Sequence, residues 1–523
     1  MSDGETLRPI SPDERIEALD VVRGFALIGI FLMNIEFFNR PIEALEDGMP
    51  QALTGIDWFA SWFIAYFVQG KFWTIFSLLF GMGFAVMLAR AERDHRPFIA
   101  PYTRRIVALA VFGALHFILL WTGDILFSYA VAAAGLLVVL YARWWGFVIA
   151  VPVLVGLGFV PGLSAAWSFG GTLALLGVIA LYLRSDRRVL RMPVFSFIYA
   201  IVTLLGAIAS TLCWLVPAVP MLAAIIVTTV TGTFLVTVIL SARYHDPAAL
   251  RPLRLGASLY VIPALVMITI GAVQYATTPE PLDADQQQSI TERVQREHDE
   301  ERVMSSGTYR EAVALRAEEF PQKAANDAGF SIIAIGMFLI GVWFVRSGTI
   351  RDPRAHLRLF RRLAFYALPL GLGLGIAGSL IATSHTIGDR ADGFHLASAL
   401  SMLGSLPASL GYVGLVIVAL YSNTAFSRIR VLAPAGRMAL TNYLTQSIVS
   451  TSIFYGYGAG QWGLARAWQV VFVAAVFTLQ VGFSHWWLAR FRYGPMEWVW
   501  RAVTYRTLPE MRLRPLVVAP AGG

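Results

Sequence analysis

A histidine and an aspartate in an otherwise apolar stretch have the residue types that acid–base chemistry needs. His116 stands within the run ALHFILLW, and Asp124 follows eight residues later. An imidazole titrates near neutral pH, so it can act as a general acid or base. A nearby carboxylate can orient a histidine and stabilise its charged form. The pair is the leading catalytic candidate; the alternative is a neutral histidine hydrogen-bonded to a neighbouring helix.

A polar stripe follows one side of the first apolar run, RIEALDVVRGFALIGIFLMN. Asp20, Arg23 and Asn34 are three and eleven residues apart, which puts them on one helical face with Asn34 about 16 Å beyond Arg23. Ionisable and amide groups in a helix of membrane length are costly, so each is a candidate functional residue. Lys71, which interrupts a later apolar region, belongs with Asn34 as a candidate for stabilising a developing oxyanion.

Charged residues also gather at the predicted cytoplasmic edge of the membrane. A cationic pocket there would suit an anionic cytoplasmic ligand such as a phosphate-bearing cofactor. The alternative is that these arginines only set topology and that Asp20 with Arg23 is a helix-end ion pair. The candidates for the pocket are Asp20, Arg23, Arg104, Arg105 and Arg437.

The stretch GRMALTNYLTQSIVS is unusually polar for a membrane span. Asn442 and Gln446 are four residues apart, hence on one face, and Ser447 follows them. Glu497, between Pro495 and Trp498, is poorly explained by interfacial anchoring. These four polar residues predict a substrate pathway, with interhelical hydrogen bonding as the alternative.

Composition identifies the class of protein. Of 523 residues, 57% are apolar and 14% charged, against about 25% charged in soluble proteins. The fold class is therefore all-α, a polytopic integral membrane bundle in a lipid bilayer. Basic residues gather in short loops, which indicates orientation by the positive-inside rule and no nucleic-acid partner. The single cysteine excludes a cysteine-built metal site, and no metal or nucleotide motif is present.

Apolar runs predict about 12–14 transmembrane helices with both termini cytoplasmic. Residues 1–19 carry no apolar run typical of a cleavable signal peptide, so the first span is expected to act as a signal-anchor. The region 57–89 is too long for one upright span, which predicts a half-helix (57–68) and then a span (72–89). The predicted regions are a cytoplasmic tail (1–19), an N-terminal membrane core (20–142), middle spans (143–276), an external polar segment (277–326), a C-terminal membrane domain (327–505) and a cytoplasmic tail (506–523). The external segment is expected to form a helical cap, with a flexible loop as the alternative.

Several motifs, taken in order, resemble the YeiB-like family of bacterial membrane proteins, whose C-terminal part is domain of unknown function 418. They are RIEALDVVRGFALIGIFLMN, GKFWTIFSLLFGMGF, RRIVALAVFGALHFILLWTGDILFSYA, GRMALTNYLTQS and GPMEWVWR. The resemblance covers residues 15–142 and about 326–505, and it implies a multi-pass protein of the bacterial inner membrane.

The resemblance further implies a branch of a transmembrane acyltransferase superfamily. That superfamily includes the lysosomal heparan-glucosaminide N-acetyltransferase and bacterial enzymes that decorate surface sugars. Its signature is an Arg-Gly pair opening the first span, here Arg23 and Gly24. Many of the sugar acyltransferases have a histidine eleven residues after the arginine, where this chain has Asn34. The base must then come from elsewhere, and His116 with Asp124 match the YeiB-like pattern.

Three functions follow as hypotheses. The first is an acyltransferase that takes an acyl group from cytoplasmic acyl-CoA, bound near Arg23 and Arg437, to a sugar or envelope glycolipid near the outer face. His116 would be its general base, held by Asp124. The second is a transporter of a small molecule or lipid without covalent chemistry. The third is a structural or assembly protein whose polar residues serve packing. The oligomeric state stays open.

Overall fold

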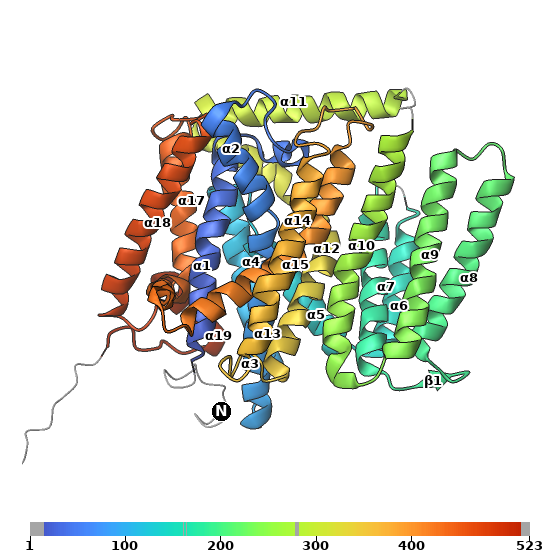
Figure 1. Ribbon diagram of the computed structural model, residues 1–523, viewed down its shortest axis with the longest axis horizontal. Helices are drawn as coiled ribbons and strands as arrows, with labels where there is room; N and C mark the ends of the chain where they lie inside the picture. Colours follow the sequence, from blue (N-terminus) through green and yellow to red (C-terminus); the bar gives the residue numbers. More distant parts are fainter. Residues whose placement is uncertain (1–14, 161, 164, 278–281, 514–523) are drawn as a thin grey trace, which may run out of the picture.

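The computed structural model describes residues 15–160, 162–163, 165–277 and 282–513. These residues form a helical bundle (Figure 1). Two strands of two residues each, β1 (Arg188–Val189) and β2 (Met192–Pro193), pair as a short hairpin. The predicted fold class, an all-α polytopic membrane bundle, is confirmed. Most of the predicted tails, 1–14 and 514–523, lies outside the described residues.

The N-terminal helices are α1 (Glu17–Asn34), α2 (Gly55–Phe63), α3 (Lys71–Arg93), α4 (Ile99–Leu119), α5 (Leu126–Tyr141), α6 (Trp144–Leu157), α7 (Ala165–Arg184), α8 (Val194–Leu215), α9 (Met221–Tyr244) and α10 (Arg251–Ala276). The C-terminal helices are α11 (Ala284–Ser306), α12 (Tyr309–Arg346), α13 (Leu357–Arg362), α14 (Leu368–Ser379), α15 (Phe394–Leu420), α16 (Ala433–Arg437), α17 (Ala439–Phe454), α18 (Arg466–Leu488) and α19 (Pro495–Tyr505). Within the described residues, eleven helical segments are long and apolar enough to cross a membrane, and α5 and α6 are shorter apolar helices.

The interruption predicted between residues 68 and 72 is present. A π-helical turn, Ile64–Val68, follows α2, and α3 then begins at Lys71. Gly70 has a φ of +79°, in the left-handed region that only glycine adopts without cost. A short helix and a full-length helix therefore follow one another here, as the length of the apolar region required.

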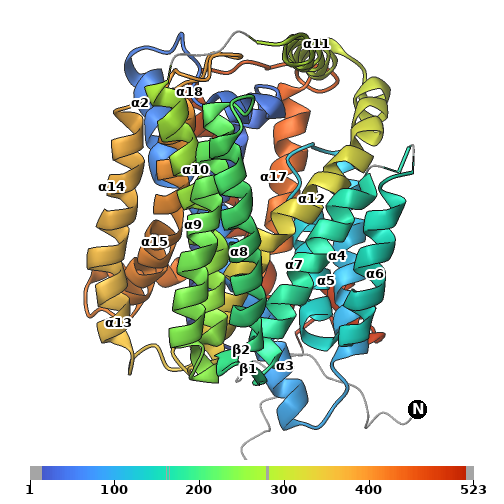
Figure 2. The ribbon, with the colours of Figure 1, turned by 90° about the vertical axis from the view of Figure 1, so that its right-hand side faces the viewer.

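The polar segment before residue 327 is helical, but its end differs from the prediction. α11 lies across one end of the bundle in Figure 1, where it caps the membrane helices. α12 begins at Tyr309 and runs without a break to Arg346, whereas a new span was expected at 327. Thr308 starts this helix with a capping box, and its helical hydrogen bonds continue past Pro321. Figure 2 shows α12 crossing the bundle obliquely, and its apolar part is well buried.

Small residues bring the central helices into close contact. A side chain at Gly24 of α1 would collide with the carbonyl oxygen of Leu432, and one at Gly436 of α16 would collide with that of Asp20. Gly81 of α3 faces the backbone of α12 in the same way. Such contacts let helix backbones approach within a membrane, where van der Waals packing drives association. They fix α1 against α16, the two helices that carry Arg23 and Arg437.

Arginine-rich loops lie together at the end of the bundle opposite α11, the lower end in Figure 1. They include the β1–β2 hairpin and the segment between α12 and α13. The positive-inside rule predicts that this end faces the cytoplasm and that α11 lies outside. Peripheral α8 exposes most of its side chains and buries only Phe195, Ser196, Thr203 and Ser210, as expected of a helix that faces lipid.

Candidate functional site

Three buried side chains form a hydrogen-bonded chain in the bundle interior. Nδ1 of His116, in the last turn of α4, lies 2.9 Å from Oδ1 of Asp124 in the α4–α5 connection. Nε2 of the same ring lies 2.8 Å from Oγ of Ser447 on α17. The three residues are 2%, 4% and 1% exposed. A carboxylate, an imidazole and a hydroxyl in this order have the connectivity of a serine-hydrolase triad.

The partners of Asp124 decide which imidazole nitrogen carries the proton. Its carboxylate is an acceptor on both oxygens, because Oδ2 also accepts the backbone N–H of Phe127 at 2.8 Å. Nδ1 of His116 is therefore the N–H donor toward Asp124, and Nε2 keeps its lone pair. Nε2 then accepts the O–H of Ser447, which is the arrangement a general base needs.

The loop that carries Asp124 is held from the α11 side. Arg316 of α12 donates from Nε to the carbonyl of Ile118 at 3.0 Å and from Nη1 to that of Leu120 at 2.6 Å. Trp121 donates its indole N–H to the carbonyl of Phe37 at 3.0 Å. Arg316 and Trp121 are almost fully buried. A fixed loop keeps the carboxylate within hydrogen-bonding distance of the imidazole.

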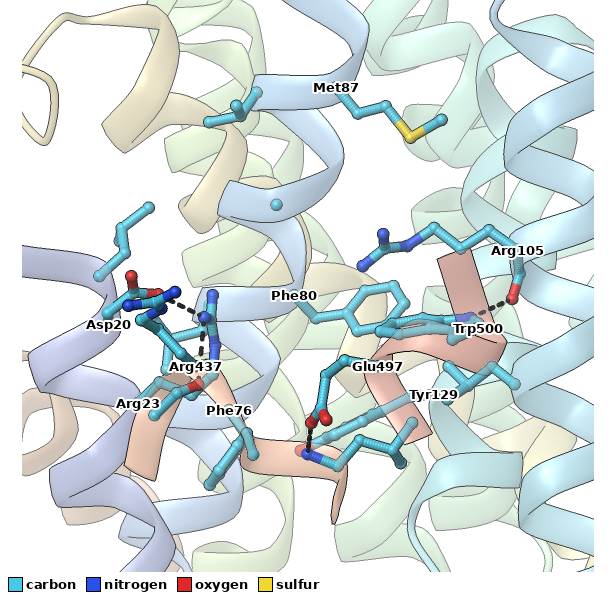
Figure 3. Close-up of a pocket in the computed structure, with 18 of the residues that line it drawn as sticks. Asp20, Arg23, Phe76, Phe80, Met87, Arg105, Tyr129, Arg437, Glu497 and Trp500 are labelled. Atoms are coloured by element: carbon cyan, nitrogen blue, oxygen red, sulfur yellow. Dashed lines mark hydrogen bonds and ion pairs between the residues drawn. The ribbon is translucent and has the colours of Figure 1, made fainter. Parts of the chain in front are cut away.

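A cavity of about 290 Å³ extends from the arginine-rich end of the bundle toward the hydrogen-bonded residues Asp124, His116 and Ser447. Residues of α1, α3, α4, the start of α5, α16, α17 and α19 line it. In Figure 3, Arg23 and Arg437 lie on one side, Arg105 lies across from them, and Phe80 lies between. The cavity therefore joins a charged part to an apolar part.

The charges of the cavity lining are predominantly positive. The lining arginines are Arg15, Arg23, Arg90, Arg105, Arg437 and Arg501. Two carboxylates, Asp20 and Glu497, accompany these six arginines, which leaves a net charge of four positive units. Burial together with the charge of Arg437 lowers the pKa of Arg15 to about 10. Nε of Arg437 is buried with no hydrogen-bond partner among the described residues. The lining thus favours an anionic ligand.

The two lining carboxylates already have partners. Asp20 receives a hydrogen bond of 2.9 Å from Arg23, which also contacts the carbonyl of Gly436 at 3.4 Å. Glu497 accepts the backbone N–H of Leu440 at 2.7 Å and the hydroxyl of Thr441 at 2.6 Å. Burial raises the pKa of Glu497 although these hydrogen bonds oppose the rise. Glu497 thereby caps the N-terminus of α17, the helix that carries Ser447.

Tyr443 separates the cavity from the hydrogen-bonded chain. Its side chain lines the cavity, and its ring centroid lies 5.0 Å from that of His116. Ile125 and Leu126, next to Asp124, line the same end. His116 and Ser447 do not line the cavity themselves. The Tyr443 ring therefore lies between the cavity and the imidazole of His116.

Other predicted site residues lie elsewhere. Arg104 does not line the cavity and donates to the carbonyl of Thr504 at 2.9 Å. Asn34 and Lys71 are both buried, and neither lines the cavity. Nζ of Lys71 has no hydrogen-bond partner within the described part of the chain. Neither residue is placed as the oxyanion partner of His116 by any contact in this structure.

Asn442 and Gln446 face α18 and connect the two helices. Asn442 donates to the hydroxyl of Ser484 at 3.1 Å, and Gln446 donates to Gln480 at 3.0 Å. Gln480 in turn donates to the carbonyl of Asn442 at 2.9 Å. The alternative interpretation, interhelical hydrogen bonding, describes these two residues, while Ser447 on a different face contacts His116.

Several lining residues were missed from the sequence. Arg15 precedes the first helix, and Trp500 and Arg501 belong to a stretch interpreted as interfacial anchoring. The guanidinium of Arg105 lies 3.9 Å from the Trp500 ring centroid, which positions it at the cavity. Tyr443 stood within the polar stretch already singled out, and the spacing of four from Ser447 was the available signal.

One described cluster has the residue types of a metal site. Asp186, His245 and Asp246 bring one ligand atom each within 4.8 Å of one another. Arg251 forms ion pairs with both carboxylates, since its Nη2 lies 2.5 Å from Oδ1 of Asp186 and 3.1 Å from Oδ1 of Asp246. This arrangement is that of an ion-pair cluster, and it lies apart from the cavity lining.

Comparison with known proteins identifies relatives along nearly the whole chain. Residues 344–507 match the family described as "Protein of unknown function (DUF418)". The chain is 27% identical to the uncharacterized protein YxaH of Bacillus subtilis (strain 168), over 96% of each chain. It is 25% identical to the uncharacterized protein YeiB of Escherichia coli (strain K12), over 94% of this chain and 97% of the relative.

A third relative matches a shorter part. An uncharacterized 39.9 kDa protein from the amylase 3′ region of Bacillus acidopullulyticus is 42% identical over 25% of this chain and 34% of its own length. No solved structure gives a significant match. The DUF418 region carries Arg437, Ser447 and Glu497, and the two long relatives extend across the His116 region as well. The chain is a member of the YeiB-like family of multi-pass membrane proteins, whose C-terminal part is the DUF418 domain.

Proposed function

We propose that this chain is an integral-membrane acyltransferase. It takes an acyl group from acyl-CoA bound in the cavity and transfers it to a hydroxyl or amine of a sugar or envelope glycolipid near the outer face. The observation that carries the proposal is the buried chain Asp124–His116–Ser447 directly behind the inner end of an arginine-lined cavity. Acyl transfer is the chemistry for which such a chain is suited.

The charge of the cavity supports a phosphate-bearing donor. Guanidinium groups bind phosphate oxygens through paired, charge-assisted hydrogen bonds. The six lining arginines lie at the predicted cytoplasmic end, where acyl-CoA is available. The apolar part of the lining, which includes Phe76 and Phe80, suits a pantetheine arm and an acyl chain.

The spacing of Arg105 and His116 along α4 supports the same orientation of the donor. Arg105 and His116 both belong to α4 and are eleven residues apart, which corresponds to about 16 Å along the helix. An extended pantetheine arm bridges such a distance, so phosphates near Arg105 put the thioester near Tyr443. The reacting carbonyl then lies beside His116 once the Tyr443 ring has moved.

The test measures thiol release and product formation with purified protein in proteoliposomes. Radiolabelled acetyl-CoA and palmitoyl-CoA serve as donors, and a lipid and glycan extract of the bacterial envelope serves as acceptor. His116→Asn is expected to lower acyl-dependent CoA release by about 10²–10⁴-fold. His485→Asn, which changes an exposed histidine on α18 whose imidazole binds the carbonyl of Val431, is the matched control and retains activity. Equal turnover by both variants at equal protein level would refute the proposed role of His116.

A second candidate function rests on Lys71. Its ammonium group is fully buried and has no hydrogen-bond partner in the described part of the chain. Unpaired ionisable groups inside membrane bundles mark ion or substrate pathways. We infer transport of a small molecule or lipid as the alternative activity. Proteoliposomes that move a labelled solute without any covalent product, and lose this transport in Lys71→Met, would favour it over acyl transfer.

A further inference from the structure

The hydroxyl of Ser447 contacts a histidine of another helix and not the backbone of its own helix. Serine and threonine in a helix commonly donate to the carbonyl four residues earlier. Ser405, Thr445 and Thr451 do so, at 2.8, 2.7 and 2.9 Å. Oγ of Ser447 instead lies 2.8 Å from Nε2 of His116. A hydroxyl whose donor is turned toward an unprotonated imidazole nitrogen is an activated nucleophile.

We propose that Ser447 is the nucleophile of the acyl transfer and that the reaction passes through an acyl-serine intermediate. This proposal deepens the acyltransferase function and rests on it. Asp124 is a positioning residue, because it holds the imidazole and fixes its tautomer without touching the acyl group. His116 is the catalytic base and acid, and Ser447 carries the acyl group.

In the first half-reaction, Oγ of Ser447 attacks the thioester carbonyl carbon while Nε2 of His116 takes the hydroxyl proton. The C–S bond breaks, and the leaving thiolate takes that proton from Nε2 to become free CoA thiol. In the second half-reaction, an acceptor hydroxyl gives its proton to Nε2 and attacks the ester carbonyl. The bond to Oγ breaks, and Oγ recovers its proton from His116.

The surroundings of Ser447 favour this two-step transfer through an acyl-serine, called the relay below. The cavity reaches the chain from the predicted cytoplasmic side, with Tyr443 as its last lining residue on α17. The opposite side is closed by a buried cluster that includes Phe38, Trp121 and Tyr455. With that side closed, an acceptor does not reach His116 while acyl-CoA fills the cavity. A covalent intermediate lets CoA leave before the acceptor arrives, so both need not occupy the site together.

The experiment detects the intermediate directly. Full-length protein in detergent is mixed with [1-¹⁴C]acetyl-CoA or [1-¹⁴C]palmitoyl-CoA without acceptor, quenched in acid and digested. Mass spectrometry of the peptide that contains residues 439–454 is expected to show one acyl group on Ser447. An oxygen ester survives neutral hydroxylamine, whereas a thioester on Cys213, the single cysteine, does not. Ser447→Ala is expected to abolish the label.

Ser450→Ala is the matched control. Ser450 lies one turn along the same helix and is fully buried, and its Oγ has no hydrogen-bond partner among the residues that the structure describes. Its loss therefore tests folding without touching His116. It is expected to keep the label. Asp124→Asn is expected to label more slowly and to shift the pH profile of labelling, which a purely structural loss would not do. Thermal unfolding of each variant establishes equal folding.

The outcomes separate the two proposals. Label on Ser447 that an added acceptor removes supports the relay. Undiminished transfer to acceptor by folded Ser447→Ala overturns the relay but leaves the acyltransferase function standing, because direct transfer then occurs. Wild-type protein that neither takes label nor releases CoA overturns both proposals.

Discussion

Two adjacent arginines allow a sharp test of donor binding. Arg105 lines the cavity, and its guanidinium stacks on Trp500 at 3.9 Å. Arg104 lies outside the lining and donates to the carbonyl of Thr504. Arg105→Met lowers the net positive charge of the lining from four units to three, whereas Arg104→Met removes the same charge from the chain and leaves the lining intact.

The expected size of the effect follows from one lost charge-assisted contact. A hydrogen bond to a charged group contributes about 1.5–3 kcal/mol. Since 1.4 kcal/mol corresponds to a tenfold change in Kd, Arg105→Met is expected to weaken CoA binding by roughly 10- to 100-fold. The backbone carbonyl of Arg105 still accepts the indole N–H of Trp500 in this variant, so the wall of the cavity keeps that hydrogen bond.

The assay is equilibrium binding of radiolabelled CoA to purified protein in nanodiscs at several salt concentrations. Arg104→Met is expected to stay within about twofold of the wild type at physiological salt, because screening limits the reach of a charge to about 8 Å. Equal weakening in both variants would mean that overall charge attracts CoA and that the cavity is not its site. Unchanged binding in both would refute the assignment of the cavity to a phosphate-bearing ligand.

Three further predictions concern the elements that position the site. Gly24→Ala forces a side chain against the carbonyl of Leu432 and is expected to destabilise the protein by about 1–3 kcal/mol in thermal unfolding, whereas Gly373→Ala, which meets no atom within 4 Å, is not. Burial and nearby Glu319 raise the pKa of Glu300 on α11 to about 8, so the folded cap binds a proton more tightly than the unfolded chain and loses stability as pH rises from about 4.5 to 8. Hydrogen exchange of α11 should therefore quicken over that range after correction for intrinsic rates, and pH-independent protection in the wild type would contradict this assignment. Tyr443→Ala removes the ring between cavity and imidazole and is expected to speed hydrolysis of acyl-CoA by water; an unchanged hydrolysis rate would argue against Tyr443 as the barrier.

The sequence identified most of the polar residues of the site, but it did not show which of them contact one another. Composition and apolar run length were sufficient for the all-α membrane class, because a bilayer admits few other structures. His116 and Asp124 were paired correctly, since they are close in the sequence and joined by a short loop. Ser447 was grouped with Gln446, although adjacent residues on a helix point about 100° apart. Which of these faces meets α4 depends on tertiary packing that one sequence does not contain.

At the arginine-rich end of the cavity, too, the residue types were predicted but their placement was not. The sequence indicated a cationic cluster, but Arg104 and Arg105 were indistinguishable, because their directions depend on where α19 packs. The placement of Trp500 and Arg501 at the cavity also depends on α19, which returns to the bundle far along the chain from α1 and α4. A continuous α12 was missed because the change from polar to apolar residues near residue 327 predicted a boundary.

The proposed function requires that acyl-CoA lies in the cavity with its thioester toward His116. A structure of the full-length protein in nanodiscs with a non-hydrolysable thioether analogue of palmitoyl-CoA tests it most directly. Density is expected for the phosphates beside Arg105 and Arg437, and for the sulfur next to a displaced Tyr443 ring within reach of Ser447. An empty cavity at saturating analogue, or an analogue bound with its sulfur away from His116, would contradict it.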